Sequence, residues 1–352
     1  MNLSKYWITG AVLAVCCSVL PAHADAILDP SVPYGLRTLS VANLPTTSYP
    51  APDSYYYESL AFYNGNLLVA VDNPLTATEA IWQMNVQRNS SGQITGLNSP
   101  SLFATVYTSP TPVGNPFNGG IVVDSNGTVI YSVGKITPPS ASPFDLVGQV
   151  SGASNPLTNI TPLSQGGTIT AQGGISGMGN LVYNPGLNNY SITFTTDGPA
   201  GTWWKMFLAP PVGGIYTITG FQDSGINVPS NSFVYVQPGQ TITESGVLVE
   251  FNNEIMFYDI DANGLPTGTG QSWVYGNDQI LKGLVRDPVT GDVLMIAYPF
   301  GAQPGVNSNQ ILLLGSGSLN GVPEPSDAAL GLTGIVFLIA MARRKGLLNR
   351  QR

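Results

Sequence analysis

The chain has 352 residues, only 9% of them charged, and its one His and two Cys all lie within the first 24 positions. If that segment is a removed leader, the mature chain lacks both residue types, which excludes disulfides, thiolate or imidazole metal ligands and a Ser-His-Asp triad. Residues 25–320 carry six cations against 18 carboxylates, a net charge of −12, and so acidic a surface excludes nucleic acid as a partner.

The N-terminus has the three parts of a secretory signal peptide. Residues 1–5 are cationic, residues 6–20 are apolar, and Ala22 and Ala24 form an A-x-A site. We therefore expect a signal-peptide helix over residues 1–24, cleavage after Ala24, and export. Two alternatives stay open. One is a retained anchor, although the apolar run is short against the ~20 residues of a membrane span, and the other is a lipoprotein processed at a cysteine of this segment.

The body of the chain repeats one pattern. Residues 25–52 are Pro-rich and aperiodic, which indicates an extended arm or a closing strand. Over residues 53–320 an apolar run, a tight turn with Asn or Gly and a second apolar run recur, and such turns between apolar runs predict antiparallel hairpins because the turn residues must tolerate positive φ. The copies are residues 60–69, 121–130, 181–192 and 284–294, with a weaker one at 247–255.

A further strand follows two of these hairpins, at residues 80–86 and 203–208. Repeated units of three or four strands predict one all-β domain, a β-propeller of five to six irregular blades, because each blade can bury its faces against its neighbours. A β-sandwich or jelly roll is the alternative, since short strands with regular turns fit both. Stretches such as residues 254–264 resemble NHL or gluconolactonase-like propellers, and the latter resemblance implies a metal in the central channel.

One loop offers candidate metal ligands. Asp259, Asp261 and Asn263, followed by Gly264, match the first half of a D-x-[DN]-x-[DN]-G calcium loop, in which oxygen ligands at alternate positions converge on a hard cation. Gly270 stands where an EF-hand loop would close with Glu. Calcium is thus the one candidate cofactor, and the alternative is a metal-free hairpin turn in which Asp and Asn accept backbone N–H groups.

Catalysis without His would have to use carboxylates, Lys or an oxygen-bound metal. Glu58, Asp72, Glu79 and Asp197 are candidates to point into a propeller channel, and glycoside hydrolysis needs only two suitably separated carboxylates. The structural interpretation is that these acids are scattered surface or turn residues. The sequence therefore predicts no catalytic residues.

Two aromatic clusters could bind sugar rings by stacking. They are residues 55–57, three tyrosines, and residues 203–204, two tryptophans. The structural interpretation is that alternate aromatics of a strand lie in the core.

The C-terminus combines a short motif, an apolar stretch and a basic cluster. The apolar residues 328–342 predict a transmembrane helix, whose basic end stays cytoplasmic by the positive-inside rule. At 1.5 Å per residue this helix is about 22 Å long, short of a hydrocarbon core of about 30 Å, which suits a transient anchor. The motif is Val322, Pro323, Glu324 and Pro325, and the basic stop is Arg343, Arg344 and Lys345.

These three parts, in this order at the extreme C-terminus, resemble the PEP-CTERM sorting signal of Gram-negative bacteria. The resemblance covers only residues 321–352 and implies that an exosortase processes the tail at or near the Pro-Glu-Pro. It also implies a setting of exopolysaccharide, biofilm or floc matrix.

We therefore expect an exported, exosortase-sorted, non-catalytic protein of the cell surface or extracellular matrix. Its expected partners are the secretion machinery, exosortase, the inner membrane before processing, and exopolysaccharide. Two alternatives remain, a metal-dependent β-propeller hydrolase or lactonase and a carbohydrate-binding protein.

Overall fold

The described residues of the computed structural model form the body of the chain and belong to one compact unit, Asp25–Gly317. The expected signal-peptide and C-terminal helices lie outside them. In the part of the chain that is described, no helix has the length and hydropathy needed to cross a bilayer. The structure describes residues 26–44, 56–73, 78–108, 120–133, 146–150, 160–162, 175–196, 202–228, 232–239, 241–251, 253–262, 264–299 and 309–315.

The strands form five sheets, called blades 1 to 5 in sequence order. Blade 1 contains β4 (Tyr56–Tyr63), β5 (Asn66–Asn73), β6 (Thr78–Arg88) and β7 (Ile94–Thr108). Blade 2 contains β8 (Ile121–Val123), β9 (Val129–Val133), β10 (Leu146–Val150) and β11 (Ile160–Pro162). Blade 3 contains β12 (Ile175–Asn184), the 3₁₀ helix η1 (Pro185–Leu187), β13 (Asn189–Thr196), β14 (Trp203–Val212) and β15 (Ile215–Asp223). Blade 4 contains β16 (Ser232–Val236), β17 (Gly246–Phe251), β18 (Glu254–Ile260) and β19 (Pro266–Tyr275). Blade 5 contains β20 (Gln279–Arg286), β21 (Val293–Pro299) and β22 (Gln310–Gly315).

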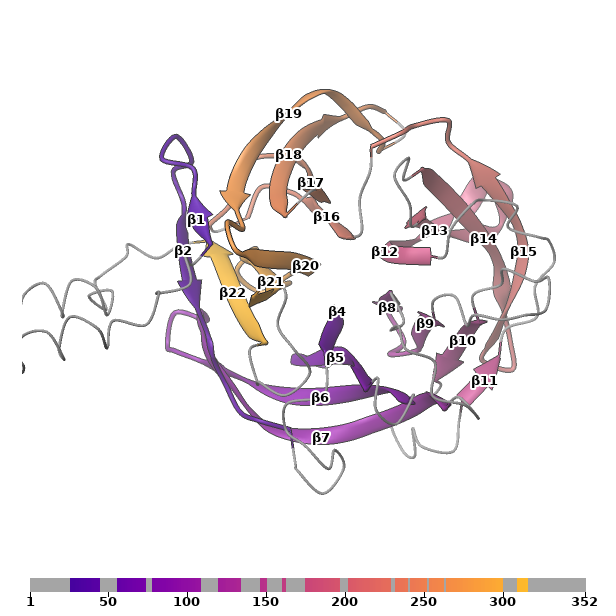
Figure 1. Ribbon diagram of the computed structural model, residues 1–352. Helices are drawn as coiled ribbons and strands as arrows, with labels where there is room; N and C mark the ends of the chain where they lie inside the picture. The colour runs from indigo at the N-terminus through magenta and orange to yellow at the C-terminus, as the bar shows by residue number, and fades with distance from the viewer. Residues whose placement is uncertain are drawn as a thin grey trace, which may run out of the picture. The chain divides into compact units, whose positions relative to one another are not determined.

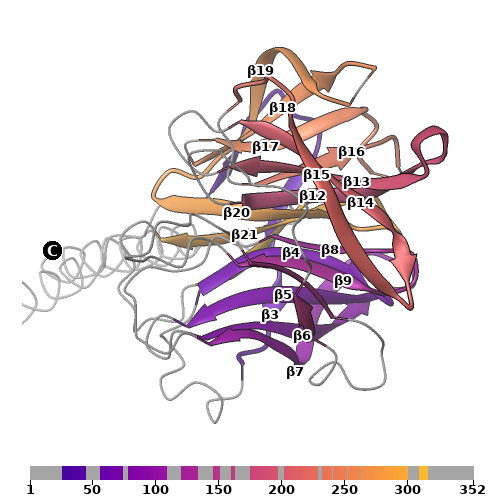
Figure 2. The same ribbon diagram turned by 90° about the vertical axis from the view of Figure 1, so that its right-hand side faces the viewer.

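The five blades surround a common centre (Figure 1). The first strand of each blade, namely β4, β8, β12, β16 and β20, lies innermost, and each contacts the first strand of the next blade, with β20 contacting β4. The molecule is therefore a five-bladed β-propeller, which settles the expected five to six blades at five and excludes the sandwich and jelly-roll alternatives. In the view turned by 90°, β20 of the last blade lies next to β4 of the first (Figure 2).

The N-terminal segment closes the ring. β2 (Gly35–Thr38) pairs antiparallel with β22 and thus supplies the fourth strand of blade 5. β1 (Ile27–Leu28) pairs with β19 of blade 4, and β3 (Ser40–Val41) pairs parallel with β7 of blade 1. Of the two expectations for this segment, an arm or a closing strand, the structure shows the closing strand, and the same segment covers the outer edges of three blades.

The hydrophobic core is divided among the five seams between neighbouring blades. In β5, Leu67, Val69 and Val71 pack against blade 5, whereas Leu68 and Ala70 pack against blade 2. All five side chains are fully buried. Because alternate residues of a strand face opposite sides of a sheet, a blade that is covered on both faces requires this uninterrupted apolar run.

The predicted hairpins are confirmed. The four clear copies coincide with the first two strands of blades 1, 2, 3 and 5. Asn64 and Gly65 join β4 to β5 with φ of 47° and 79°, as a two-residue hairpin turn requires. The weaker copy is instead the β17–β18 hairpin, the middle of blade 4, because a longer connection separates β16 from β17. The predicted third strands at residues 80–86 and 203–208 are parts of β6 and β14.

Candidate functional site

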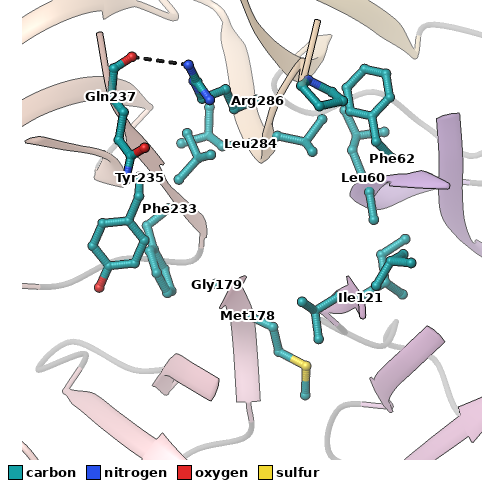
Figure 3. A pocket seen from close by; sticks show the side chains of 16 residues that line it. Leu60, Phe62, Ile121, Met178, Gly179, Phe233, Tyr235, Gln237, Leu284 and Arg286 are labelled. Carbon is teal, nitrogen blue, oxygen red and sulfur yellow. Dashed lines mark hydrogen bonds between the residues drawn. The ribbon is translucent and has the colours of Figure 1, made fainter. Parts of the chain in front are cut away.

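A cavity of about 340 Å³ lies in the central channel. It is lined by residues of the inner strands of all five blades, which surround a shared space (Figure 3). This volume falls at the small end of the range of roughly 300–1,000 Å³ that small-molecule sites occupy. Most of the lining residues are apolar, including Leu60, Phe62, Ile121, Val123, Met178, Phe233, Leu284 and Val285, although polar atoms also contribute to the surface of the cavity. Among the described residues that line it, Arg286 alone is charged.

A buried ion pair joins the inner strands of the first and last blades. Lys282 Nζ of β20 donates to Glu58 Oε2 of β4, and the two side chains are 11% and 2% exposed. Each charged residue lies two positions before a cavity-lining leucine, Leu60 or Leu284. Burial alone would lower the pKa of Lys282, but the Glu58 carboxylate and Tyr298 outweigh it and raise the pKa to about 12. Lys282 is therefore protonated at neutral pH and lies beside the Glu58 carboxylate.

Irregularities in both inner strands accompany this pair. The register of β4 shifts between Tyr57 and Ser59, and that of β20 shifts between Lys282 and Val285. Gly283, at the second irregularity, has a φ of 62°, and a Cβ there would overlap Ile296, so only glycine fits. Bulges redirect side chains next to functional sites, and here they coincide with the two charged residues.

Asp72 of β5 belongs to the same charged cluster. It is fully buried, and neither carboxylate oxygen has a hydrogen-bond partner among the described residues. Burial, followed by repulsion from Glu58, raises the pKa of Asp72 from 3.8 to about 8, although Lys282 opposes the shift. The carboxyl group is therefore mostly protonated at neutral pH. Perturbed acids of this kind mark candidate functional sites.

This raised pKa predicts a pH-dependent stability. Between pH 3.8 and about 8 the unfolded chain releases the Asp72 proton and the folded chain retains it, so the free energy of unfolding falls as pH rises across that window. In Asp72→Asn this fall in the free energy of unfolding should disappear. Because one group contributes ~1.4 kcal/mol for each pH unit between its two pKa values, the variant should be more stable than the parent by at least about 2 kcal/mol near pH 8. Urea unfolding of the parent and the variant at about pH 4 and about pH 8 measures this difference in stability. An equal difference at both pH values would contradict the raised pKa of Asp72.

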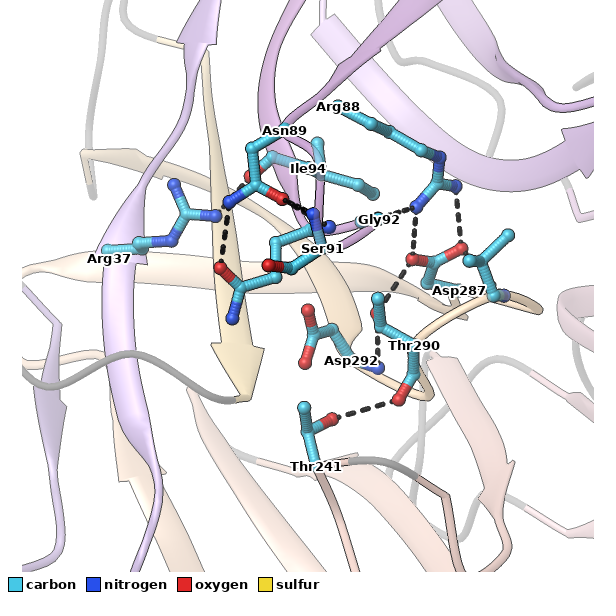
Figure 4. Close-up of polar contacts among 12 residues, drawn as sticks. Arg37, Arg88, Asn89, Ser91, Gly92, Ile94, Thr241, Asp287, Thr290 and Asp292 are labelled. Carbon is cyan, nitrogen blue, oxygen red and sulfur yellow. Dashed lines mark hydrogen bonds and ion pairs between the residues drawn. The ribbon is translucent and has the colours of Figure 1, made fainter.

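A second ion pair crosses the same seam. Arg88 of β6 donates to both carboxylate oxygens of Asp287, which follows β20, over 2.7 and 2.8 Å (Figure 4). Thr290 Oγ1 donates to Asp287 Oδ2 at 2.7 Å. Burial opposes ionisation, but these hydrogen bonds hold the pKa of Asp287 below its usual value. Both ion pairs found among the described residues thus link blade 1 to blade 5.

Of the four candidate catalytic acids, the structure brings two close together. Glu58 and Asp72 lie close enough to raise the pKa of Asp72. Glu79 is paired with Asp72 in the β5–β6 register, its side chain is not described, and Asp197 lies outside the described residues. The surface interpretation is wrong for Glu58 and Asp72, since both are buried. Sequence reasoning missed Lys282 and Arg286. A signal was available, because the single strand β20 holds two of the six cations of the body.

The calcium candidate is a structured turn. Asp259 is exposed at the end of β18, and Asp261 Oδ1 accepts the Leu265 N–H at 2.9 Å. Asn263 lies outside the described residues. Within the described ranges, no three His, Cys, Asp or Glu residues are placed to share a metal. Calcium here stays a prediction, which thermal unfolding with and without calcium tests.

Two members of the aromatic clusters, Tyr57 and Trp203, are in the core. Tyr57 is buried at the seam between blades 1 and 5. Trp203 packs on Phe233 with ring centroids 4.3 Å apart and donates from Nε1 to Val228 O at 3.1 Å. Trp204 stacks on Phe194. Tyr57 and Trp203 are therefore core residues, whereas Trp204 is half-buried.

The signal-cleavage residues Ala22 and Ala24, the motif Val322 to Pro325 and the basic stop Arg343 to Lys345 all lie outside the described residues. Their predicted roles stay predictions.

Comparison with family models and with curated proteins finds no match. Among solved structures, the chain is similar to a putative oxidoreductase (glucose dehydrogenase) from Thermus thermophilus, at 10% identity and a TM-score of 0.40, covering 80% of this chain and 99% of that one. It is also similar to an α-L-arabinanase from Penicillium chrysogenum complexed with arabinobiose, at 11% identity and a TM-score of 0.41, covering 82% and 79%.

Proposed function

We propose that the protein is an exported, surface-sorted β-propeller that binds a small, largely apolar ligand in its central channel and does not transform it. The apolar residues that predominate among those lining the channel cavity support this proposal. Residues of all five inner strands line the cavity. An apolar ligand that entered it would remove both its own surface and that of the lining from water, which favours binding.

Binding in the channel can be tested with octan-1-ol as a probe, by isothermal titration calorimetry on the mature protein. Val123→Trp should fill part of the cavity and weaken octanol binding at least about tenfold, since an overfilled site excludes its ligand. Thr217→Trp, on the exposed face of β15, is the matched control and should bind octanol as the parent does. Equal affinities in all three proteins, or no binding to the parent, would refute the channel as a ligand site.

The sorting step is a separate part of the proposal. What supports it is the order of parts at the C-terminus: a V-P-E-P motif, an apolar stretch and a basic cluster, in agreement with the positive-inside rule. After processing, we expect the protein at the cell surface or in an exopolysaccharide matrix. Mass spectrometry of the exported protein should find the N-terminus at Asp25 and a C-terminus at or near Glu324. An exported form that still ends at Arg352 would contradict processing.

A second candidate, a β-propeller hydrolase, is favoured by one observation. Asp72 has a pKa of about 8 beside Glu58, so a protonated and an ionised carboxyl group lie in one buried cluster, as acid–base catalysis requires. Against it, Glu58 already pairs with Lys282. Hydrolysis of a lactone or glycoside panel that is lost in both Glu58→Gln and Asp72→Asn, with the folds intact, would favour the enzyme over the binding protein.

A further inference from the structure

Arg286 is placed at the rim of the channel cavity. It is the last residue of β20, and its side chain lies beside Gln237, which follows β16 (Figure 3). Nη2 donates to the Gln237 carbonyl oxygen at 3.2 Å. The guanidinium also packs closely against Gly239 and Gly291, where an added Cβ would lie 3.0 and 3.1 Å from Nη2. The backbone of blades 4 and 5 therefore confines this side chain.

The guanidinium retains unused hydrogen-bonding capacity. Nε is buried and has no hydrogen-bond partner within the described part of the chain. None of the carboxylates that the structure describes forms an ion pair with Arg286, in contrast to Arg88 with Asp287 and Lys282 with Glu58. A buried donor without an acceptor costs free energy, and a cation in an otherwise strongly acidic body would be expected to attract a counter-charge. Arg286 combines both features at the edge of an apolar space.

We propose that the channel ligand is an amphiphile whose apolar part fills the cavity and whose single anionic end, a carboxylate, pairs with Arg286. This inference rests on the proposed binding function and specifies its ligand class. The planar fork of arginine matches a carboxylate and forms strong charge-assisted hydrogen bonds with it. The body's net charge of −12 disfavours ligands with several negative charges. The many apolar residues among those that line the cavity favour a ligand with an apolar part, whose burial contributes to binding.

The test compares octanoate with octan-1-ol, which share the chain and differ in the charged end. The mature protein should bind octanoate more tightly than octanol at neutral pH. Arg286→Gln should weaken octanoate binding at least about tenfold, the expected loss of a charge-assisted pair, and should change the Kd of octanol by less than about twofold. Isothermal titration calorimetry gives both affinities, and a thermal melt confirms that the variant is folded.

Two further variants keep the result interpretable. Lys205→Gln removes the same charge from β14 of blade 3 and should leave octanoate binding unchanged, which excludes a general electrostatic effect. Arg286→Lys retains the charge without the planar fork and should bind octanoate less tightly than the parent, so it serves if Arg286→Gln does not fold. If octanol binds and octanoate binds no better, or Arg286→Gln affects both equally, the anionic end is wrong while channel binding stands. If neither probe binds, the proposed function itself fails.

Discussion

Lys282→Met should be among the most destabilising single substitutions in this protein. The change removes the cation that compensates Glu58, a carboxylate of 2% exposure at the seam of blades 1 and 5. Breaking a buried ion pair from one side typically costs about 3–5 kcal/mol. For a domain of this size that corresponds to a fall in Tm on the order of 10 °C, measured by thermal or urea unfolding at neutral pH.

The double variant Glu58→Gln with Lys282→Met separates the effect of the Glu58 charge from the loss of packing. It leaves no buried ion from this pair, so we expect it to recover at least half of the stability lost in the single variant. Lys205→Met on blade 3 serves as the matched control and should change stability by no more than about 0.5 kcal/mol. A single variant as stable as the parent would show that the pair does not hold the seam together.

Removal of residues 26–41 from the mature chain should abolish cooperative folding. The deletion takes away β1, β2 and β3, so β22 loses the partner to which β2 is paired over Gly35–Gly315 to Thr38–Leu312. It also removes Val32 and Leu36 from the core between blades 4 and 5. An unpaired edge strand beside an exposed apolar seam promotes aggregation. We therefore expect a protein that fails to give a single unfolding transition in circular dichroism.

Addition of the missing segment as a peptide provides the control. A synthetic peptide of residues 26–44 should restore a transition by donating β2 in trans, as strand complementation does in other sheets. A scrambled peptide of the same composition should not. If the truncated protein melts like the parent, β2 is dispensable and blade 5 is stable with three strands.

Much of the fold was readable from local sequence signals. The Asn64–Gly65 turn and its flanking apolar runs predicted a hairpin, because positive φ at both turn positions is a local requirement. The apolar runs on either side of that turn correctly marked the strands β4 and β5. The same local reasoning also predicted the hairpin at 247–255, which is the middle hairpin of blade 4. A local pattern identifies a hairpin but does not show whether its strands are the first two or the middle two of a blade.

The candidate site was not readable in this way. Glu58 and Lys282 are separated by 224 residues, and they meet only because the ring brings the first and last blades together. Asp72 was a candidate acid, but its raised pKa arises from burial and from Glu58, neither of which is encoded near it. Arg286 is one of two cations in the otherwise mostly apolar strand β20, and its place at the cavity rim depends on the meeting of blades 4 and 5.

Composition limits the chemistry that is available to the body of the protein. With no His or Cys after position 24, any site must be built from carboxylates, a few cations and amide, hydroxyl or apolar side chains, and this limit needs no knowledge of the fold. The number of blades, the closure by β2 and the choice of which few charged groups are buried together emerge only in the folded ring. They do so because burial and pairing between distant strands depend on ring closure, a property of the whole chain that no short segment contains.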